Sequence, residues 1–318
     1  MRVLVTGATG FIGSNLSFRL LESGHSVVGV DCFSEYYPAR LKRHNAQGLV
    51  SCGMELMECD LASGDLSSSL EGVECVIHSA AQPGITASTP WDDYQRNNIL
   101  ATHRLLDAAS SSSTLAAFIN ISTSSVYGKF ATDAEETAPK PASWYGVTKL
   151  AAEQEAMALY RNSGFPACSL RLFSVIGERE RPDKLFPKLI RCIANEEAFP
   201  LYEGSLEHRR SFTYVGDVCD AILAALDQWN KVKGEVFNIG SNHSFSTAEA
   251  IEFVEGIMGK KARLEKLPSR PGDQQSTHAD IEKARSMIGW EPKTSLEQAL
   301  KNIVSWYMDE IHTKMEWR

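Results

Sequence analysis

A glycine-rich loop near the N-terminus constrains the fold more than any other feature of the sequence. Gly7, Gly10 and Gly13 form a G-x-x-G-x-x-G pattern that follows the apolar segment Arg2–Thr6 and opens a helical segment containing NLSFRLLES. Glycines at this spacing let the backbone approach a pyrophosphate, and a helix N-terminus presents free N–H groups to it. The order of strand, loop and helix therefore predicts a dinucleotide-binding unit.

Short β-rich segments continue to alternate with helical ones along the first half of the chain. The expected strands after the first are Val27–Asp31, Glu55–Cys59, Cys75–Ser79, Ala117–Ile121 and Ser169–Phe173. Nearly continuous apolar runs such as VVGV and CVIH suit strands that are buried on both faces. The alternation predicts an α/β fold, a doubly wound parallel sheet of Rossmann type with helices on both faces.

The pattern changes after about residue 176, where longer helical segments are punctuated by Pro and Gly. We expect residues 1–176 to form the cofactor-binding Rossmann domain, with a later strand and helix returning to it near residues 211–240. Residues 177–318 are then expected to form a smaller, mainly helical substrate-binding domain. Capping boxes support two of its helices, one with Ser246 and Glu249 and the other with Thr294 and Glu297.

Composition and charge exclude several classes of function. A net charge of −8 and a pI near 5.6 indicate no global attraction to nucleic acid or to an anionic membrane. The N-terminal segment resembles no secretory signal and no apolar run is long enough to span a membrane, so we expect a cytoplasmic protein. The seven cysteines include no C-x-x-C pair, which favours free thiols and predicts no metal site.

One acidic residue points to the kind of dinucleotide. Asp31 ends the second expected strand, where a carboxylate can bond the ribose hydroxyls of the adenosine and repel a 2′-phosphate. The position therefore favours NAD over NADP. Asp60 and Leu61, which follow the third strand, are weaker candidates for flanking the adenine ring.

A second group of residues suggests acid–base chemistry. Tyr145 and Lys149 are four residues apart on an expected helix, so both side chains lie on one face. An ammonium beside a phenol lowers the phenol pKa from about 10 toward working pH and makes it a usable base. The hydroxyl cluster of residues 122–125 follows an expected strand and can serve the same substrate oxygen. A solvated helix face is the alternative for an isolated Y-x-x-x-K pair.

These motifs together resemble a known family. TGATGFIG, HSAA, STSSVYG and YGVTK occur here in the order and spacing of the extended short-chain dehydrogenases, the NAD-dependent epimerase/dehydratase family. The resemblance implies Thr123 as the hydroxyl partner of the substrate, Tyr145 as the base and Lys149 as a ribose ligand. The expected cofactor contacts are Gly7, Gly10, Phe11, Ile12, Gly13, Asp31, Asp60, Leu61, Ala80, Ala81, Asn98, Tyr145 and Lys149. His78 and Tyr127 are expected to have structural roles.

The C-terminal half extends the resemblance to the substrate side. RRSFTYVGDV and RPGD look like the family's diphosphate-binding segments, and RLFSVIGERERPDKLFP resembles UDP-glucuronate 4-epimerases, in which a hydroxyl and an arginine hold the sugar carboxylate. The usual tyrosine of that segment is Ile176 here. The expected substrate contacts are Thr123, Ser124, Ser125, Ser174, Arg181, Arg210, Arg270 and Asp273.

The residues after the catalytic threonine separate the chemistries of the family. Related 4,6-dehydratases carry Asp-Glu there and UDP-glucuronate decarboxylases commonly carry Glu at the second position, whereas this chain has Ser124 and Ser125. We therefore expect an NAD-dependent nucleotide-sugar 4-epimerase that acts on a UDP-hexose or UDP-glucuronate through a transient 4-keto intermediate. The alternatives are a dehydratase, a decarboxylase, a ketoreductase or a non-catalytic NAD sensor. Analogy also predicts a homodimer formed through the helices around Asn97–Ser110 and Tyr145–Tyr160.

Overall fold

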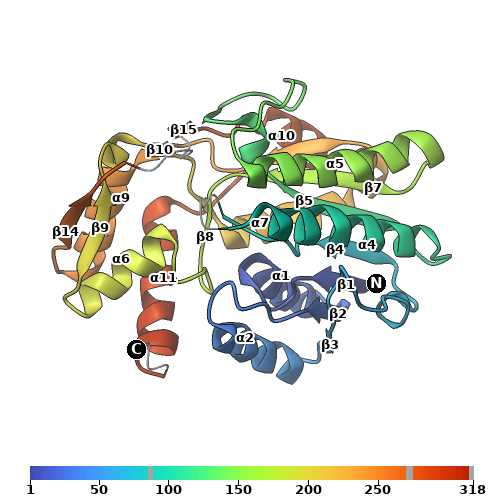
Figure 1. The fold of residues 1–318 in the computed structure, drawn as a ribbon, viewed down its shortest axis with the longest axis horizontal. Helices are drawn as coiled ribbons and strands as arrows, with labels where there is room; N and C mark the ends of the chain where they lie inside the picture. Colours follow the sequence, from blue (N-terminus) through green and yellow to red (C-terminus); the bar gives the residue numbers. More distant parts are fainter. Residues whose placement is uncertain (85–88, 270–274, 315–318) are drawn as a thin grey trace.

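The structure is a computed structural model that describes residues 1–84, 89–269 and 275–314. Its described part contains a seven-stranded sheet in which every pair of neighbouring strands is parallel, in the order β12-β7-β5-β4-β1-β2-β3 (Figure 1). The strands are β1 (Arg2–Thr6), β2 (Ser26–Asp31), β3 (Glu55–Glu58), β4 (Cys75–His78), β5 (Ala117–Thr123), β7 (Ala167–Leu172) and β12 (Val236–Ile239). This arrangement confirms the predicted doubly wound Rossmann sheet.

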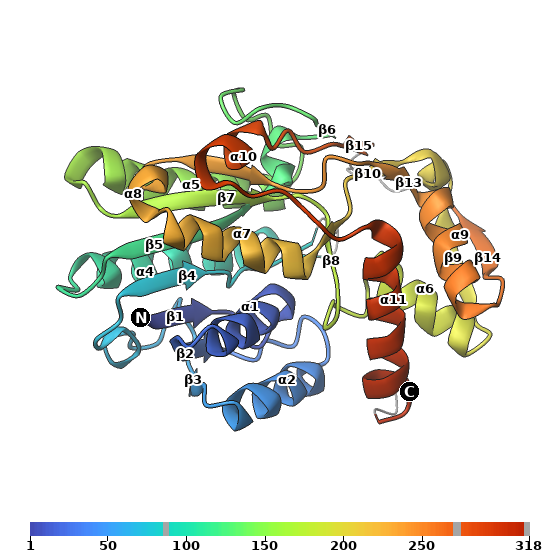
Figure 2. The ribbon, with the colours of Figure 1, turned by 180° about the vertical axis from the view of Figure 1, so that it is seen from behind.

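Helices cover both faces of the sheet, as the apolar character of its strands requires. One face carries α1 (Phe11–Glu22), α7 (Val215–Asp227), α8 (Trp229–Val232) and α10 (Glu282–Ile288), which lie in front of the sheet in Figure 2. The other face carries α4 (Ala101–Ser110) and α5 (Trp144–Ser163). Next to α1 and β3 lies α2 (Ala39–Ser51).

The strand order places a crevice at one end of the sheet. Strand β1 pairs with β2 on one side and with β4 on the other, so the chain segments that follow β1 and β4 leave the sheet in opposite directions. In open parallel sheets, ligands bind at this switch point, outside the carboxyl ends of the strands. The fold therefore positions a binding site between the glycine loop and the segments that follow β4 and β5.

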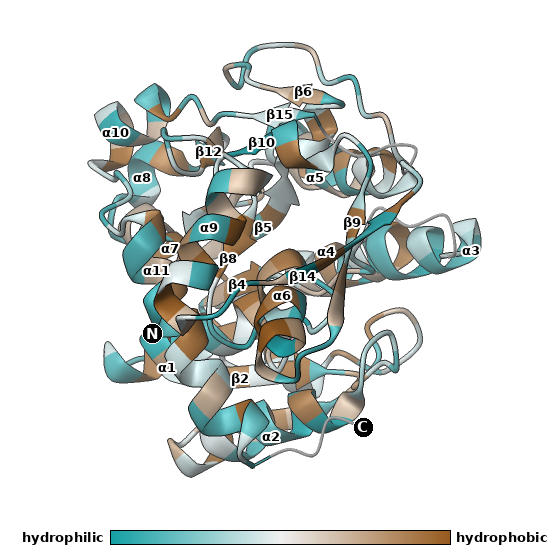
Figure 3. Cartoon of the chain, turned by 90° about the vertical axis from the view of Figure 1, so that its left-hand side faces the viewer, coloured by the Kyte–Doolittle hydropathy of each residue, from teal (hydrophilic) through white to brown (hydrophobic). Residues whose placement is uncertain are grey.

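A second part of the molecule lies beyond these carboxyl ends (Figures 1 and 3). It contains α6 (Leu185–Ala194), α9 (Thr247–Met258), α11 (Leu296–Trp306) and the parallel pair β9 (Ala198–Tyr202) and β14 (Arg263–Leu267). These elements share a separate apolar core that includes Leu189, Val254 and Leu300. Much of α6 is strongly hydrophobic in Figure 3, which agrees with its place in that core.

Short elements join the two parts. The strands are β6 (Phe130–Ala131), β10 (Arg209–Arg210), β13 (Phe245–Ser246) and β15 (Ser276–Thr277) in one small sheet, and β8 (Val175–Ile176) with β11 (Thr213–Tyr214) in another. The remaining short helical elements are η1 (Ser68–Leu70), α3 (Trp91–Tyr94), η2 (Gln95–Leu100), η3 (Ser124–Tyr127), η4 (Ser205–Glu207) and η5 (Tyr307–His312). The side chains of Ala279, Ala284 and Trp290 belong to the core on the sheet. Residues near 279–290 therefore return to the sheet in addition to the predicted return near 211–240.

Helix caps show one correct and one wrong prediction. The capping box of α9 is present, since Glu249 N–H donates to Ser246 Oγ at 3.1 Å and Ser246 N–H donates to the Glu249 carboxylate at 2.6 Å. The box with Thr294 is absent. Thr294 instead donates its N–H and Oγ1–H to the carboxylate of Asp217, both at 3.0 Å, and Ser295 caps α11 one residue later.

Two negative findings apply to the described residues. No helix within residues 1–84, 89–269 and 275–314 combines the length and the hydropathy needed to cross a bilayer. The same part of the chain contains no group of three or more side chains of His, Cys, Asp or Glu that could hold a metal ion. All seven cysteines are free thiols, as predicted.

Candidate active site

A cavity of about 790 Å³ opens at the switch point of the sheet and extends to α6 and β9 of the second part. It brings together most of the residues that the sequence predicted to bind cofactor or substrate. The predicted residues that line it are Gly7, Gly10, Phe11, Ile12, Gly13, Asp31, Asp60, Leu61, Ala80, Ala81, Thr123, Ser124, Ser125, Tyr145, Lys149, Ser174, Arg181 and Arg210. Arg270 and Asp273 lie outside the described residues.

The glycine loop needs its glycines for steric reasons. Gly7 has a φ of +64°, and a Cβ there would lie 2.9 Å from Cα of Ala80, at the end of the neighbouring strand β4. A Cβ at Gly13 would lie 2.1 Å from the carbonyl oxygen of Gly7. The loop is therefore closed tightly enough to leave a backbone cradle at the N-terminus of α1, which fits a pyrophosphate.

Asp31 is fixed at the end of β2 beside this cradle. One carboxylate oxygen accepts the N–H of Thr9 at 3.1 Å and the other accepts the N–H of Phe33 at 2.9 Å. Each oxygen keeps a further lone pair for a ribose hydroxyl, because a carboxylate can accept about four hydrogen bonds. The cradle and this anchored carboxylate together fit a dinucleotide without a 2′-phosphate.

The predicted acid–base residues converge on the same cavity from β5 and α5. Thr123 ends β5, Tyr145 lies in the first turn of α5, and Lys149 follows one turn later. The side chains of Thr123 and Tyr145 are hydrogen-bonded to each other. Helix α5 begins at this point because Ser143 caps it, accepting the N–H of Gly146 at 3.1 Å.

The pKa of Tyr145 differs from the prediction. Burial raises the pKa of this phenol above its usual value, although the hydrogen bond with Thr123 and the charge of Arg181 oppose the rise. The predicted lowering by Lys149 is therefore wrong for the protein alone, because desolvation of the phenolate outweighs the nearby positive charges. Burial also lowers the pKa of Lys149 to about 8, against the opposing charge of Glu153.

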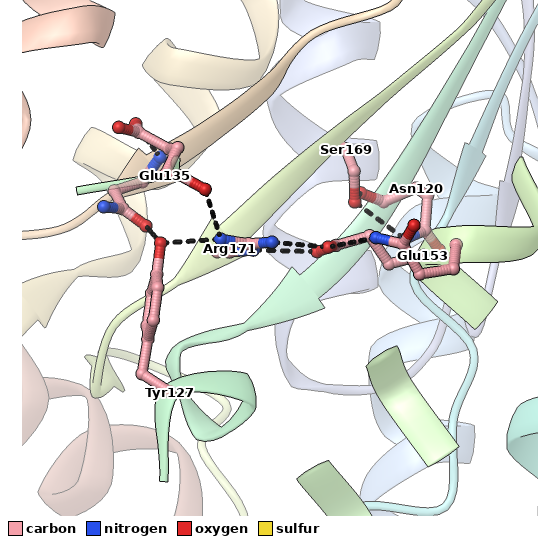
Figure 4. Close-up of polar contacts among 8 residues, drawn as sticks. Asn120, Tyr127, Glu135, Glu153, Ser169 and Arg171 are labelled. Atoms are coloured by element: carbon pink, nitrogen blue, oxygen red, sulfur yellow. Dashed lines mark hydrogen bonds and ion pairs between the residues drawn. The ribbon is translucent and has the colours of Figure 1, made fainter. Parts of the chain in front are cut away.

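A buried polar network fixes α5 against the sheet (Figure 4). Arg171 of β7 donates two hydrogen bonds to the carboxylate of Glu153, at 3.0 and 2.7 Å, and a third to Tyr127 Oη at 2.7 Å. Tyr127 in turn donates to Asn238 Oδ1 at 2.8 Å. Because Glu153 lies one helical turn after Lys149, this network sets the position of the catalytic face of α5.

Two further residues named in the sequence analysis, Asn98 and His78, are buried next to the cavity without lining it. The Asn98 carboxamide accepts the N–H of Gln82 at 2.7 Å and donates to Thr148 Oγ1 at 3.0 Å. Asn98 does not line the cavity, and its side chain links the loop after β4 to α5, which agrees with a helix residue that supports the active site. His78 lies between hydroxyls of Thr6 and Thr102, at 2.8 and 2.9 Å, and burial lowers its pKa to about 3.

The far half of the cavity contains the predicted substrate residues. Ser124 and Ser125 are buried in η3, and Ser174 follows β7 with an unusual φ of +29°, a strained conformation of the kind that occurs at functional sites. Arg181 is 8% exposed and donates one Nη to Asp183 at 3.2 Å. Its other Nη is buried and has no hydrogen-bond partner among the residues that the structure describes. The residue therefore lines the cavity while one of its guanidinium nitrogens is bound by no described residue.

The structure adds cavity residues that the sequence reasoning missed. Glu180 and Lys184 flank Arg181 and line the cavity, and burial raises the pKa of Glu180 to about 8 and lowers that of Lys184. Gln82 also lines the cavity, and its amide nitrogen is buried without a partner. The segment containing Glu180 and Lys184 was singled out in the sequence only for Ser174 and Arg181. Its density of charged residues was the signal that could have identified the other two.

A Rossmann sheet with a dinucleotide cradle and a converging Thr-Tyr-Lys set defines an oxidoreductase-type active site that works with a nicotinamide dinucleotide. Comparison with known proteins is more specific. The model of the NAD dependent epimerase/dehydratase family matches residues 3–240. The chain therefore belongs to the NAD-dependent epimerase/dehydratase family.

Individual relatives narrow the comparison further. The chain is 37% identical to an uncharacterised UDP-glucose epimerase of Bacillus subtilis, over 96% of this chain and 98% of that one. It is 34% identical to UDP-glucuronate 4-epimerase 3 of Arabidopsis thaliana, over 96% and 76%. The crystal structure of UDP-glucuronic acid 4-epimerase from Bacillus cereus, in complex with UDP-glucuronic acid and NAD, matches with a TM-score of 0.92 and 38% identity, over 97% and 99%. The predicted family, NAD cofactor and UDP-sugar 4-epimerase class are confirmed.

Proposed function

We propose that this protein is a UDP-glucuronate 4-epimerase. The observation that carries the substrate is the guanidinium of Arg181, which is buried in the cavity with one Nη lacking a partner. A buried charged donor left without an acceptor is costly, whereas a carboxylate accepts two N–H groups of an arginine side by side. The C6 carboxylate of a glucuronate supplies that acceptor, and the C6 hydroxyl of a glucose does not supply the charge.

The serine hydroxyls extend this carboxylate site. Ser124, Ser125 and Ser174 line the same cavity as Arg181 and would supply neutral hydroxyl donors to the sugar carboxylate. Neither serine of η3 can act as the general acid or base that elimination of water needs. Holding the carboxylate also opposes decarboxylation, because a carboxylate β to a ketone is lost most easily when it is free to turn.

The remaining predicted contacts would place the cofactor in one half of the cavity and the substrate in the other half. The cradle at Gly7 to Gly13, together with Asp31, would hold NAD, with Asp60 and Leu61 beside its adenine and with Ala80 and Ala81 toward the nicotinamide. Arg210, which lines the cavity from β10, would bind the diphosphate of UDP. We keep the interpretation of residues 177–318 as mainly substrate-binding, because α6, β9 and β10 provide the opposite wall.

Tyr145 and Thr123 would carry the proton transfer. NAD, when bound, would supply a reversible hydride acceptor that is positively charged in its oxidised form. Tyr145 removes the proton from the C4 hydroxyl, and Thr123, which is hydrogen-bonded to Tyr145, holds the same oxygen. Lys149 lies one turn away and would bind the nicotinamide ribose. Once the 4-keto sugar has turned to present its opposite face, Tyr145 would return the proton to the C4 oxygen.

We also propose that the protein is a homodimer. Four apolar side chains near the ends of the predicted helices are exposed, namely Trp91, Leu100, Trp144 and Val147. The rings of Trp91 and Trp144 pack edge to face with centroids 5.0 Å apart, so the patch is preorganised. Exposed apolar patches of this kind mark protein interfaces. Light scattering on the wild type should give the mass of two chains, and Val147→Glu should give the mass of one.

The free thiols of all seven cysteines favour the predicted cytoplasmic location, where thiols stay reduced. Expression as a fusion with a fluorescent protein would test it, and a fluorescence signal outside the cytoplasm would contradict it.

A competition assay tests the substrate assignment. UDP-glucuronate and UDP-glucose are mixed at equal concentration with the wild-type protein, and the disappearance of each is followed. We expect UDP-glucuronate to be consumed at least about 10-fold faster, because hydrogen bonds to a charged group are worth about 1.5–3 kcal/mol. Arg181→Ala should remove that preference. Equal consumption of both sugars by the wild type would contradict the proposal.

A further inference from the structure

Glu180 is a buried carboxyl group that neither the acid–base chemistry nor the carboxylate site uses. Glu180 lines the cavity and is 3% exposed, and within residues 1–84, 89–269 and 275–314 its buried Oε2 atom has no hydrogen-bond partner. It directly precedes Arg181, the proposed ligand of the sugar carboxylate. Two carboxylates beside one arginine would repel each other unless one of them carries a proton.

We propose that Glu180 is a specificity-determining residue that binds the substrate in its neutral form, donating its O–H to an oxygen of the sugar carboxylate held by Arg181. This inference rests on the proposed function, since only a uronic acid brings a carboxylate to this place. A protonated carboxyl is one donor, and the carboxyl group of Glu180, a residue that lines the cavity, has an oxygen that no described residue binds.

The charges around Glu180 favour this protonation state. The charged groups that act on it come from its own segment, namely Arg181, Lys184 and Asp183. If Glu180 is ionised, the two positive charges of Arg181 and Lys184 balance the two negative charges of Glu180 and Asp183. The carboxylate of the incoming substrate would then add a negative charge that nothing balances. With Glu180 neutral, one positive charge is left over for the substrate. Burial favours the neutral form, because it raises the pKa of Glu180.

Groups on other elements complete the surroundings of this segment. Arg210 of β10 acts on Lys184, Tyr36 stacks on the guanidinium of Arg181 with 5.1 Å between the guanidinium carbon and the ring centroid, and Arg181 acts on Tyr37. The other carboxylate near Arg181 is Asp183, whose half-exposed side chain already accepts a guanidinium N–H, so the buried Glu180 is the group that would take up a proton. Binding of UDP-glucuronate above the pKa of Glu180 must therefore take one proton from solvent onto this carboxylate.

Calorimetry on the NAD-loaded protein tests this proton uptake. UDP-glucuronate is titrated into wild type at pH 8.5 in phosphate and in Tris, two buffers with different ionisation enthalpies. We expect an uptake of about one proton per substrate bound, whereas UDP-glucose should give no uptake. The KM for UDP-glucuronate should rise above pH 8, by at most about 10-fold per pH unit for a single titrating group.

Two variants make the test specific. Glu180→Gln keeps an N–H donor but cannot titrate, so proton uptake should disappear and KM should become independent of pH between pH 7 and 9. Glu178→Gln is the matched control, because Glu178 lies two residues away and accepts a hydrogen bond from Tyr214 at 2.9 Å outside the cavity lining. This control should keep the wild-type uptake and KM profile.

The outcomes separate this inference from the proposed function. The proposed role of Glu180 is overturned if the Glu180→Gln variant takes up as many protons as the wild type and shows the same dependence of KM on pH. This holds even if the variant is less stable to heat. The role is equally overturned if the wild type epimerises UDP-glucuronate without taking up a proton. If the wild type neither binds nor converts UDP-glucuronate while it converts UDP-glucose, then the proposed function itself fails.

Discussion

Two buried charge clusters of this molecule use the same residue types in opposite ways. Beneath α5, the Arg171 guanidinium and the Glu153 carboxylate bind each other through two hydrogen bonds, and Tyr127 takes a further guanidinium N–H. In the cavity, Arg181 and Glu180 are almost as deeply buried, yet each keeps a polar atom without a partner. The first cluster is complete within the protein, whereas the second leaves one atom of each side chain without a partner among the described residues, and we propose that the substrate completes it.

The difference shows how to recognise a functional charge in a buried site. Most buried polar groups of native proteins have partners, so an exception requires an explanation. A complete ion pair fixes the position of its helix, and removing one partner leaves an uncompensated charge. An incomplete cluster that lines a cavity costs stability and provides binding instead. Substitutions in the two clusters should therefore separate stability from activity.

The largest expected effect lies in the complete cluster. Glu153→Gln leaves the guanidinium of Arg171 buried with no countercharge, and the free energy of unfolding should fall by about 3–5 kcal/mol, as for other broken buried pairs. Chemical denaturation of the NAD-free protein measures this loss. The double variant Glu153→Leu with Arg171→Met should recover most of the stability. If the single variant loses less than about 1 kcal/mol of unfolding free energy, the Arg171–Glu153 pair does not contribute more than a surface ion pair, and the proposed difference between the two clusters is wrong.

Tyr145→Phe should have the opposite signature. The ring remains and the base is deleted, so kcat should fall by about 10²–10⁴-fold, the usual contribution of general acid–base catalysis. NAD should remain bound, and the free energy of unfolding should not fall, because burial already disfavours the phenolate. Steady-state kinetics and the absorbance of released cofactor test both points. Turnover within a few-fold of wild type would remove Tyr145 from its role.

Arg181→Ala sharpens the comparison because it deletes a buried charge without breaking a complete pair. The KM for UDP-glucuronate should rise by about 10–100-fold, which corresponds to about 1.5–3 kcal/mol. Part of the product should be decarboxylated, since the 4-keto acid is no longer held. Unfolding free energy should change by no more than about 1 kcal/mol, because one Nη had no partner and the other bonds the half-exposed Asp183. A loss like that expected for Glu153→Gln would show that the two clusters are alike.

Thr123→Ala should have the smallest effect. Its hydroxyl shares a hydrogen bond with Tyr145 and accepts the N–H of Ser125 at 3.2 Å. Water or Ser124 can replace one hydroxyl, so kcat should fall by only about 3–10-fold, the equivalent of one ordinary hydrogen bond. Steady-state kinetics beside Tyr145→Phe measures the ratio of the two effects. A loss as large as that of Tyr145→Phe would make Thr123 an equal partner in proton transfer.

Local sequence patterns were sufficient for the sheet and for identifying a set of site residues, most of which line the cavity. The glycine loop, the apolar strands and the Tyr145 and Lys149 pair each depend on residues close together in the chain, so their spacing predicts their geometry. The pKa of Tyr145 could not be predicted in this way, because it depends on how much protein surrounds the phenol. The direction of that prediction was wrong for this reason.

Long-range contacts account for the other differences. The cap of α11 moved from Thr294 to Ser295 because the carboxylate of Asp217, far away in sequence, binds Thr294. Glu180 was missed because its burial depends on the packing of the second part against the sheet. The roles of Arg270 and Asp273 stay predictions, since these two residues lie outside the described part of the chain.

The most direct test of the central claim follows UDP-glucuronate labelled with deuterium at C4. The wild-type protein is incubated with it in ordinary water without added cofactor, and the product is analysed by mass spectrometry and NMR. A 4-epimerase that returns the same hydride gives a product of unchanged mass, with inverted configuration at C4 and with the deuterium retained. A product lighter by carbon dioxide or water, or one that has lost its label to solvent, would contradict the account.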